Sequence, residues 1–498
     1  MKILLLKPPI TLPKQFSGIN TRFSQPIGLG YIASMLEKNG YDDVKIIDTG
    51  IEDWKRINKR YDGKEYAGMN FGDIKKIIEK ELPDIIGITS MTPDATNAFI
   101  ISKLAKEVSS DIKTMMGGPH ACAMPEETLM EGIDFVCIGE GEYMFLELVE
   151  ELEKESPKFE NIKGMWFKED GKIIKNEPRP PIENLDELPF PARHLMNYKK
   201  YFEANKYLQG AREIEKRRDT IITSRGCPFN CVFCSIKISM GRTFRPRSPE
   251  NVVTEIEEMV SKYNIGNISF EDDNFTFNME RAHKICDLII ERGLNKKISW
   301  DTPNGIRADR VDEKLLIKMQ KAGCKEVVFS PESGNQYVVN NLIGKKLDLK
   351  KVEEDARICK KIGMKCRMFF VMGIPGETKN QINDTVEFAK RMKEEYCVEP
   401  MLFSALPYYS TDLYRICKEN GYLIKIDKSS FEQALIGMEP MISPPEFTPE
   451  YIARVKKEFI KDEHKILRTV FERPLDSARA FILHPKHVLK YLVKKAIK

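Results

Sequence analysis

The sequence alternates short apolar runs with longer segments of helical periodicity, and it does so in two separate series. In the first 150 residues, runs such as KILLLK, DIIGITS and DFVCIG are separated by helical segments such as ATNAFIISKLAKEVSS. This alternation is typical of a doubly wound parallel sheet, because each parallel connection crosses over through a helix. The sequence therefore predicts an α/β fold that begins with a Rossmann-like domain.

A second series begins at DTIITSRG and continues through NISFEDDNF, ISWDTPNGIRAD, EVVFSPESGN, CRMFFVMGIPGET and EPMLFSALPYYS. Six strand-and-helix units in a row predict a partial (β/α)6 barrel of the TIM type, whose chemistry lies at the carboxyl ends of the strands. Between the two series, Asp170-Gly171 marks a hairpin turn, and a proline-rich stretch follows. We expect a Rossmann-like domain at 1–155, a hairpin and linker at 156–215, a barrel at 216–425 and a helical C-terminal region at 426–498.

Cys227, Cys231 and Cys234 lie within eight residues, directly after the first strand of the second series. The chain has 11 cysteines in 498 residues, and the other eight are scattered. We find neither a secretory signal nor a run of about 18 apolar residues, so we expect a cytoplasmic protein without a disulfide framework. A net charge of +4 from 79 basic and 75 acidic residues gives no support for nucleic-acid binding.

The C-x3-C-x2-C spacing offers three thiolates, and this number is informative. A structural zinc site takes four ligands, and so does an ordinary [4Fe–4S] cluster. No fourth cysteine or histidine is near in the sequence. A cubane held by three thiolates leaves one iron open to a substrate or cofactor. The alternative is a zinc site completed by a distant residue.

This motif, with Phe233 before its third cysteine, resembles the signature of the radical S-adenosylmethionine (SAM) enzymes. The resemblance implies a [4Fe–4S] cluster that binds and reductively cleaves SAM, so that a 5′-deoxyadenosyl radical abstracts hydrogen from an unactivated carbon. It also implies an electron donor such as ferredoxin or flavodoxin. Each motif at the end of a later strand in the second series, taken singly, is also typical of an ordinary helix cap or turn. In order, they match the family's SAM contacts, which implies Glu271, Asp272 and Asp273 at the ammonium, Arg307 at the carboxylate, Glu332 and Ser333 at the ribose, and Gly373 and Gly376 along the adenine.

The first series resembles the cobalamin-binding domain that precedes the barrel in one large class of these enzymes. The matching stretches are PIGLGYIASMLEKNGY, PDIIGITS, GGPHA and GEGE. The D-x-H-x-x-G motif that ligates cobalt in other cobalamin domains is missing, and PPITLPKQFSG stands in its place. Glycines at strand ends let a bulky ligand approach the backbone, although ordinary turns also contain them. The resemblance implies contacts from Ser90, Gly117, Gly118, His120, Gly139, Glu140 and Gly141, with His120 as a polar contact and not a cobalt ligand.

Most members of this class are C-methyltransferases, so the resemblance implies methylation of an unactivated carbon. The alternatives are non-methylating radical chemistry, such as oxidative cyclisation of a tetrapyrrole or lipid, and a non-catalytic cobalamin sensor or scaffold. From Val488 onward, apolar residues and lysines alternate so that they fall on opposite faces of a helix. This pattern indicates either peripheral membrane contact or docking on the barrel. The first would fit a lipid-like substrate, whereas the second leaves a small soluble molecule and a lipid equally open.

Overall fold

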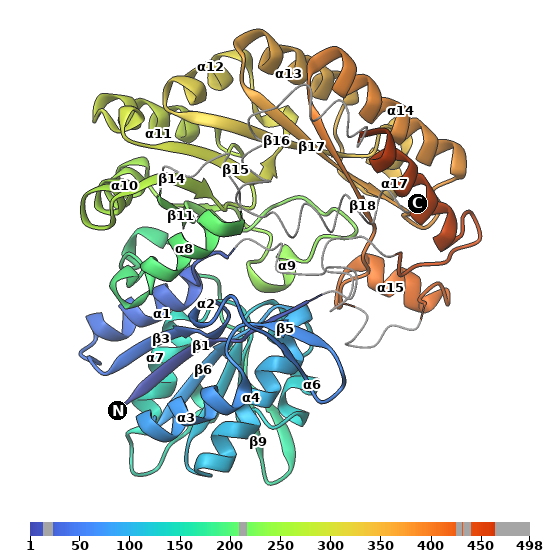
Figure 1. Cartoon of the computed structure of the whole chain (residues 1–498). Helices are drawn as coiled ribbons and strands as arrows, with labels where there is room; N and C mark the ends of the chain where they lie inside the picture. The colour runs from blue at the N-terminus through green and yellow to red at the C-terminus, as the bar shows by residue number, and fades with distance from the viewer. Residues whose placement is uncertain (13–22, 209–216, 425–430, 432–439, 464–498) are drawn as a thin grey trace.

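The computed structural model describes residues 1–12, 23–208, 217–424, 431 and 440–463. Two α/β units follow one another in the chain, each built on its own parallel sheet. In Figure 1 the N-terminal sheet lies below the second sheet, and the helix α8 (Tyr198–Leu208) runs between them. The predicted alternation of strands and helices is confirmed in both units.

The N-terminal sheet has seven strands in the order β10-β9-β8-β7-β6-β1-β3. Its parallel strands are β1 (Ile3–Lys7), β3 (Val44–Asp48), β6 (Ile85–Thr89), β7 (Lys113–Gly117) and β8 (Phe135–Cys137). The helices α1 (Ile27–Lys38) and α7 (Glu142–Leu152) cover one face, and α3 (Phe71–Glu81) and α4 (Ala95–Val108) cover the other. Because β3 and β6 pair with opposite sides of β1, the strand order reverses there, and doubly wound sheets bind ligands at such a switch point.

The strand β1 shows why this sheet is buried on both faces. Ile3 and Leu5 pack among the residues of α1 and α7, whereas Leu4 and Leu6 pack beneath α3 and α4. All four are at most 1% exposed. A continuous apolar run is typical of a parallel strand covered by helices on both sides.

The expected hairpin and linker are integral parts of this domain. The antiparallel strands β9 (Met165–Glu169) and β10 (Lys172–Lys175) extend the N-terminal sheet beside β8. The proline-rich stretch that follows places Ile182, Leu185 and Leu188 in the core beneath α1 and α7. On α8, the Tyr201 hydroxyl donates to Asp48 at the end of β3 over 2.7 Å. From Ile182 onward, the stretch is therefore packed against the N-terminal domain.

The second sheet has six parallel strands in sequence order apart from the short pair β12–β13. They are β11 (Arg217–Ile221), β14 (Ile265–Phe270), β15 (Ser299–Ile306), β16 (Cys324–Glu332), β17 (Lys365–Met372) and β18 (Glu399–Ser404). Outside them lie α10 (Pro249–Tyr263), α11 (Met279–Glu291), α12 (Glu313–Lys321), α13 (Leu349–Ile362) and α14 (Lys379–Tyr396). Since β11 and β18 do not pair with each other, the barrel is open, as a partial barrel of six units predicts.

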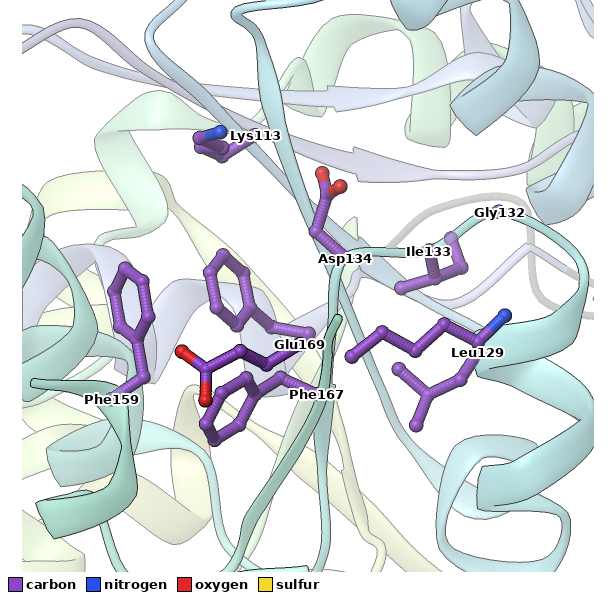
Figure 2. A pocket seen from close by; sticks show the side chains of 10 residues that line it. Lys113, Leu129, Gly132, Ile133, Asp134, Phe159, Phe167 and Glu169 are labelled. Carbon is purple, nitrogen blue, oxygen red and sulfur yellow. The ribbon is translucent and has the colours of Figure 1, made fainter. Parts of the chain in front are cut away.

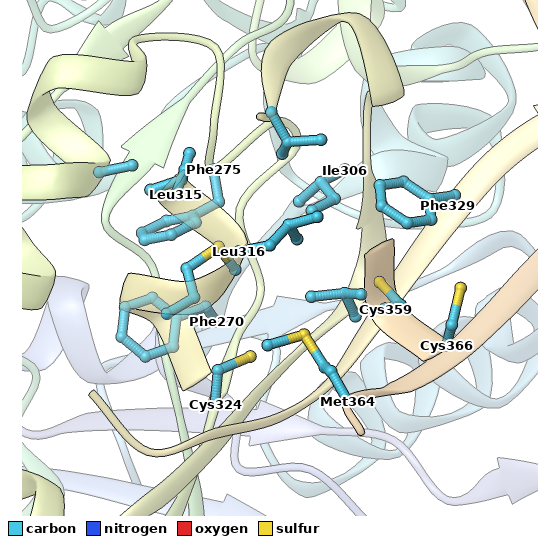
Figure 3. Packing of buried hydrophobic residues seen from close by; sticks show 14 of the residues in the cluster. Phe270, Phe275, Ile306, Leu315, Leu316, Cys324, Phe329, Cys359, Met364 and Cys366 are labelled. Carbon is cyan, nitrogen blue, oxygen red and sulfur yellow. The ribbon is translucent and has the colours of Figure 1, made fainter. Parts of the chain in front are cut away.

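The core of this domain lies between the strands and the outer helices. Figure 3 shows Phe270 and Phe275 together with Leu315 and Leu316 of α12. The Phe270 ring also lies 4.7 Å from the Trp300 ring, centroid to centroid. Alternate residues of each strand enter this core, so the remaining side chains point to the inner face of the barrel.

The remaining elements are short or lie at the ends of the two units. The N-terminal unit contains β2 (Ile10–Thr11), α2 (Thr49–Glu52), β4 (Ile57–Lys59), β5 (Glu65–Ala67), η1 (Thr92–Asp94), α5 (Pro119–Ala123), α6 (Pro125–Met130) and η2 (Phe159–Asn161). The later ones are η3 (Leu185–Glu187), η4 (Arg193–Leu195), β12 (Ser224–Arg225), α9 (Ile236–Ser239), β13 (Arg245–Pro246), η6 (Leu294–Lys296), η7 (Ala308–Arg310), η8 (Val338–Leu342), α15 (Asp412–Glu419) and α17 (Pro449–Glu463).

The amphipathic segment from Val488 onward lies outside the described residues, as does the remainder of the predicted helical tail beyond α17. Among the described helices, none combines the length and apolar character needed to cross a membrane.

Candidate active site

The three cysteines lie in the loop between β12 and β13, at the carboxyl end of β11. Gly226 opens this loop with a φ of +80°, and a Cβ there would lie 2.3 Å from the Thr243 carbonyl oxygen. Further along, the Val232 amide donates to the Ile343 carbonyl, and the Leu413 amide donates to the Val232 carbonyl, each over 2.9 Å. The loop is therefore shaped by the surrounding protein on both sides.

All three cysteines are half-buried free thiols. Burial raises the pKa of Cys227 and of Cys231, and it raises the pKa of Cys234 to about 12, so a metal that binds them must displace their protons. In the described part of the chain, no three His, Cys, Asp or Glu side chains are arranged to hold a single metal ion. Three thiols on one loop match the ligand number of a cubane that keeps one iron open.

The acidic residues that follow β14 are close to the cysteine loop. Asp273 accepts a hydrogen bond from the Gly226 amide over 2.9 Å, and burial raises its pKa to about 6. Asp272 accepts from the Thr223 amide over 2.6 Å and from the Ser224 hydroxyl over 2.7 Å, which ties the end of β14 to β12. Burial also raises the pKa of Glu271. Asp273 is thus the acid in contact with the cysteine loop, Asp272 supports the backbone, and their expected contacts with SAM stay predictions.

Glu332 was predicted from the sequence, but Lys345, its partner in a buried ion pair beside the second cysteine, was not. The Lys345 ammonium lies 2.8 Å from Glu332 Oε1, and both side chains are buried. Burial raises the pKa of the Cys231 thiol, while the charge of Lys345 acts in the opposite direction. Glu332 adopts a φ of +69°, a left-handed conformation that clusters at functional sites in non-glycine residues. Lys345 follows a short π-helix, where no strand-end motif marks it.

Arg307 and Ser333 contact neighbouring loops. Arg307 donates to both carboxylate oxygens of Asp309, over 2.8 and 3.0 Å, and its guanidinium lies 3.5 Å from the centre of the Phe229 ring. Arg307 therefore supports the cysteine loop through Phe229. The Ser333 hydroxyl is 2.8 Å from Thr385 Oγ1 and accepts from the Asn335 amide. Both residues line up with the expected strand ends, and their expected contacts with SAM stay predictions.

The G-I-P-G-E-T loop after β17 folds around the buried carboxylate of Glu377. Glu377 Oε2 accepts from the Gly373 amide over 2.7 Å and from the Ile374 amide over 3.1 Å. Gly373 and Gly376 have φ angles of +92° and +87°, which favour glycine. Burial raises the pKa of Glu377 to about 7. The backbone expected along the adenine is therefore fixed from beneath by this carboxylate.

The expected cobalamin contacts gather at the carboxyl edge of the N-terminal sheet. Gly118 has a φ of +91°, and a Cβ there would lie 3.0 Å from the Ser90 carbonyl oxygen. Ser90 also lines a cavity of about 200 Å³ at the ends of β1 and β6, where the strand order reverses. The cavity lies at the switch point, where doubly wound sheets bind ligands. Gly117 ends β7, and Gly139 lies two residues after the end of β8 at the same edge.

His120 points into the protein. Its ring is fully buried beside Phe99, with centroids 5.8 Å apart, and Nδ1 lies 3.4 Å from the Thr92 hydroxyl. This placement agrees with a histidine that does not bind cobalt, which stays a prediction.

A larger cavity, of about 320 Å³, lies at the opposite edge of the same sheet. Figure 2 shows Phe159 and Phe167 on one side of it, with Lys113 and Asp134 at the starts of β7 and β8. Parallel sheets bind ligands at the carboxyl ends of their strands. This cavity is therefore away from the candidate site.

The G-E-G-E stretch after β8 reaches the second domain. Glu140 Oε1 lies 2.6 Å from Arg225 Nη1, and Glu142 Oε1 lies 2.6 Å from Arg225 Nη2. Arg225 directly precedes Gly226 and the cysteine loop. Glu140, expected at cobalamin, thus links the two domains in this structure, and its contact with cobalamin stays a prediction, as does that of Gly141.

Comparison with known proteins assigns both halves of this site. The model of the radical SAM superfamily matches residues 221–389, and the model of the B12 binding domain matches residues 22–149. The chain is 34% identical to an uncharacterized methyltransferase of Pyrococcus horikoshii, over 100% of this chain and 97% of the relative. The chain belongs to the B12-binding radical SAM enzymes. As a member of this family, the enzyme uses a [4Fe–4S] cluster, SAM and cobalamin.

Two further relatives have named reactions. The enzyme is 32% identical to the cytidylyl-2-hydroxyethylphosphonate methyltransferase of Streptomyces wedmorensis, over 93% of this chain and 89% of the relative. It is 26% identical to the anaerobic magnesium-protoporphyrin IX monomethyl ester cyclase of Rubrivivax gelatinosus, over 84% and 70%. Among solved structures, the radical SAM methyltransferase TsrM of Kitasatospora setae has a TM-score of 0.68 at 15% identity, over 92% of this chain and 88% of TsrM. The structural likeness shows that this chain and TsrM share the same overall fold.

Proposed function

We propose that this radical SAM enzyme transfers a methyl group to an unactivated carbon of a small organic substrate. The observation that carries the proposal is the match to two proteins named as methyltransferases, at 34% and 32% identity over 100% and 93% of this chain. The cyclase relative keeps oxidative cyclisation as the second candidate, at lower identity and over less of both chains.

The proposed cofactor-binding residues lie at the carboxyl edges of the two sheets, one edge for each group of cofactors. When bound, the cluster with SAM supplies hydrogen abstraction, and cobalamin supplies the methyl group. Cys227, Cys231 and Cys234 hold the cluster, and Asp273 presents a carboxylate beside it. Ser90 and Gly118 would contact cobalamin at the edge of the N-terminal sheet. The positions of these residues at the carboxyl ends of both sheets support the proposed assignments.

Charged pairs and aromatic rings line the inner face of the barrel. Arg218 lies 2.6 Å from Asp301, and Arg367 lies 3.1 Å from Glu326, on strand positions that alternate with the buried core. Nearer the carboxyl ends, Phe369 and Phe403 meet with ring centroids 5.4 Å apart. An aromatic lining with a few polar groups is typical of sites that bind small organic molecules.

The reaction is tested by measuring two products together. The anaerobically reconstituted enzyme receives cobalamin, SAM, a reductant and candidate substrates, and 5′-deoxyadenosine and S-adenosylhomocysteine are quantified. We expect both products together with a methylated substrate. 5′-Deoxyadenosine alone would favour cyclisation or other radical chemistry, and neither product from any substrate would favour a non-catalytic cobalamin protein.

We also propose an external electron donor, ferredoxin or flavodoxin, since a cluster that cleaves SAM must be reduced in each cycle. Replacing a chemical reductant with either protein should sustain 5′-deoxyadenosine formation.

The cytoplasmic enzyme would contact a membrane only through the basic segment from Val488 onward. Sedimentation with anionic liposomes, comparing the full chain with one that ends at Phe481, tests this contact. Equal, salt-independent partitioning of both would refute the membrane contact and leave soluble and lipid-like substrates equally open.

A further inference from the structure

Four buried charges join the two domains at the base of the cysteine loop. We call Glu140, Glu142, Arg225 and Arg245 the clasp. Glu140 Oε2 lies 2.7 Å from Arg245 Nη1, in addition to the contacts of Arg225 with both carboxylates. Each of the four side chains is at most 6% exposed. Such charge-assisted bonds are short and directional, so they fix the relative geometry of the groups they join.

The clasp holds both ends of the loop that carries the cysteines. Arg225 on β12 and Arg245 on β13 are cross-strand partners, and the loop of residues 226–244 runs between them. One carboxylate, that of Glu140, therefore contacts the residue before the loop and the residue after it. Arg245 also donates to the Met240 carbonyl over 2.9 Å, inside the loop itself.

The other side of the clasp belongs to the cobalamin edge. Glu140 and Glu142 follow β8 through Gly139, whose amide donates to the Cys122 sulfur over 3.3 Å. Cys122 lies on α5, the short helix that follows Gly118, and α5 packs against α9 in the cysteine loop. A ligand that orders the segments of this edge therefore acts on backbone that contacts the loop at two places.

Holding the two domains together would not by itself require the buried charges of the clasp. Apolar residues of similar size hold an interface at least as well as a buried ion pair, because desolvating charges costs free energy. Here two carboxylates each lie 2.6 Å from the guanidinium of Arg225. What the charges add is a unique position for the arginine. That position sets where Cys227, two residues later, can lie.

We propose that the clasp couples the cobalamin site to the cluster site. Arg225 and Arg245 are positioning residues: their pairing with Glu140 and Glu142 transmits the ordering of the cobalamin edge to the cysteine loop. Cobalamin binding then protects the cluster and strengthens SAM binding. The inference rests on the cofactors of the proposed function, but it requires no particular substrate and no methyl transfer.

The test measures coupling in the full-length, cluster-loaded protein. Iron release to a chelator and the dissociation constant of SAM are recorded with and without cobalamin. In the wild type, we expect cobalamin to slow iron release and to tighten SAM binding at least about 5-fold, a typical lower value for coupled sites. Because coupling is reciprocal, SAM should tighten cobalamin binding by the same factor. In Glu142→Gln, both factors should fall toward one.

Two further variants separate coupling from stability. Asp219→Asn removes a different buried carboxylate at the domain junction, 2.7 Å from Arg193 and away from the loop, and it should keep the wild-type coupling even if it melts earlier. Arg225→Lys retains one charge and should restore part of the coupling lost in Arg225→Gln. A wild-type coupling factor in Glu142→Gln and Arg225→Gln would overturn the proposal, as would a wild-type protein whose cluster is indifferent to cobalamin. Coupling without a methylated product would retain the clasp and refute the proposed function.

Discussion

At the scale of single residues, the cysteines carry the same thiol group but differ in burial and in position. Cys231 and Cys417 contribute to the same apolar cluster, but Cys417 is fully buried on α15, and Cys231 lies in the half-buried loop. We expect Cys231→Ala to lose most cluster iron and all SAM cleavage, because it removes one of three protein ligands. Cys417→Ala should keep both. Iron analysis and 5′-deoxyadenosine assays check this, and an iron-replete, active Cys231→Ala would refute the cluster assignment.

Glu377 makes the stability of the fold depend on pH. Its pKa of about 7 means that the folded protein keeps a proton that the unfolded chain has lost above about pH 4.5. The unfolding free energy should therefore fall as the pH rises from about 4.5 through 7. Glu377→Gln cannot ionise and should be more stable than the wild type at pH 8, by roughly 1–3 kcal/mol.

Thermal unfolding at pH 5 to 8 measures the difference between the two proteins, which isolates Glu377 from other groups that titrate in this range. Glu313→Gln, on the surface of α12, is the control and should follow the wild-type curve. Parallel curves for the wild type and Glu377→Gln would contradict the prediction.

His120 provides a spectroscopic prediction. Since its ring is buried beside Phe99 and Thr92, we expect His120→Ala to leave the absorption spectrum of bound cobalamin unchanged, even if the protein is less stable. A spectral shift in the cobalamin bands of His120→Ala would show that this histidine ligates cobalt.

At the scale of elements, the cysteine loop depends on one glycine. Gly226→Ala would place a Cβ against the Thr243 carbonyl and force a positive φ on alanine. We expect it to impair cluster assembly while the two domains remain folded. Gly241→Ala, in the same loop, has a comparable φ of +75°, but its nearest contact is at 3.9 Å. Iron content and circular dichroism of the two variants, compared side by side, check the prediction. Equal iron in both variants would show that the close approach does not matter.

Strand ends were predictable from the sequence, whereas the partners of their side chains were not. The strand β14 and the acids after it could be located from one continuous stretch. Whether Asp272 faces a ligand or the backbone depends on Thr223 and Ser224, 49 and 48 residues away. The same holds for Glu140, whose partner Arg225 is 85 residues distant. Local patterns indicate an element and its edge, but contacts between domains arise only from the complete fold.

At the scale of the whole molecule, the N-terminal domain includes strands and core residues that follow residue 155. A fragment of residues 1–155 lacks β9, β10 and the core residues Ile162 and Phe167. We expect a fragment of residues 1–196 to be more soluble and to bind cobalamin more tightly than the shorter one, because it completes the sheet edge and the core. Absorbance titrations of both fragments with cobalamin provide the measurement. Tighter binding by residues 1–155 would contradict it.

The bridge made by Glu140 also implies an order of maturation. The two arginines that it joins lie 85 and 105 residues further along the chain. On the ribosome, the N-terminal domain emerges and folds first, and domains of large proteins generally fold as units. The cysteine loop then gains its final shape only after the second domain has been synthesised and has met the first. Since Val232 in the same loop also pairs with the backbone of Ile343 and Leu413, we expect iron and sulfide to be inserted only after residue 413 has been synthesised, and a chain stalled earlier to be a poor recipient for them.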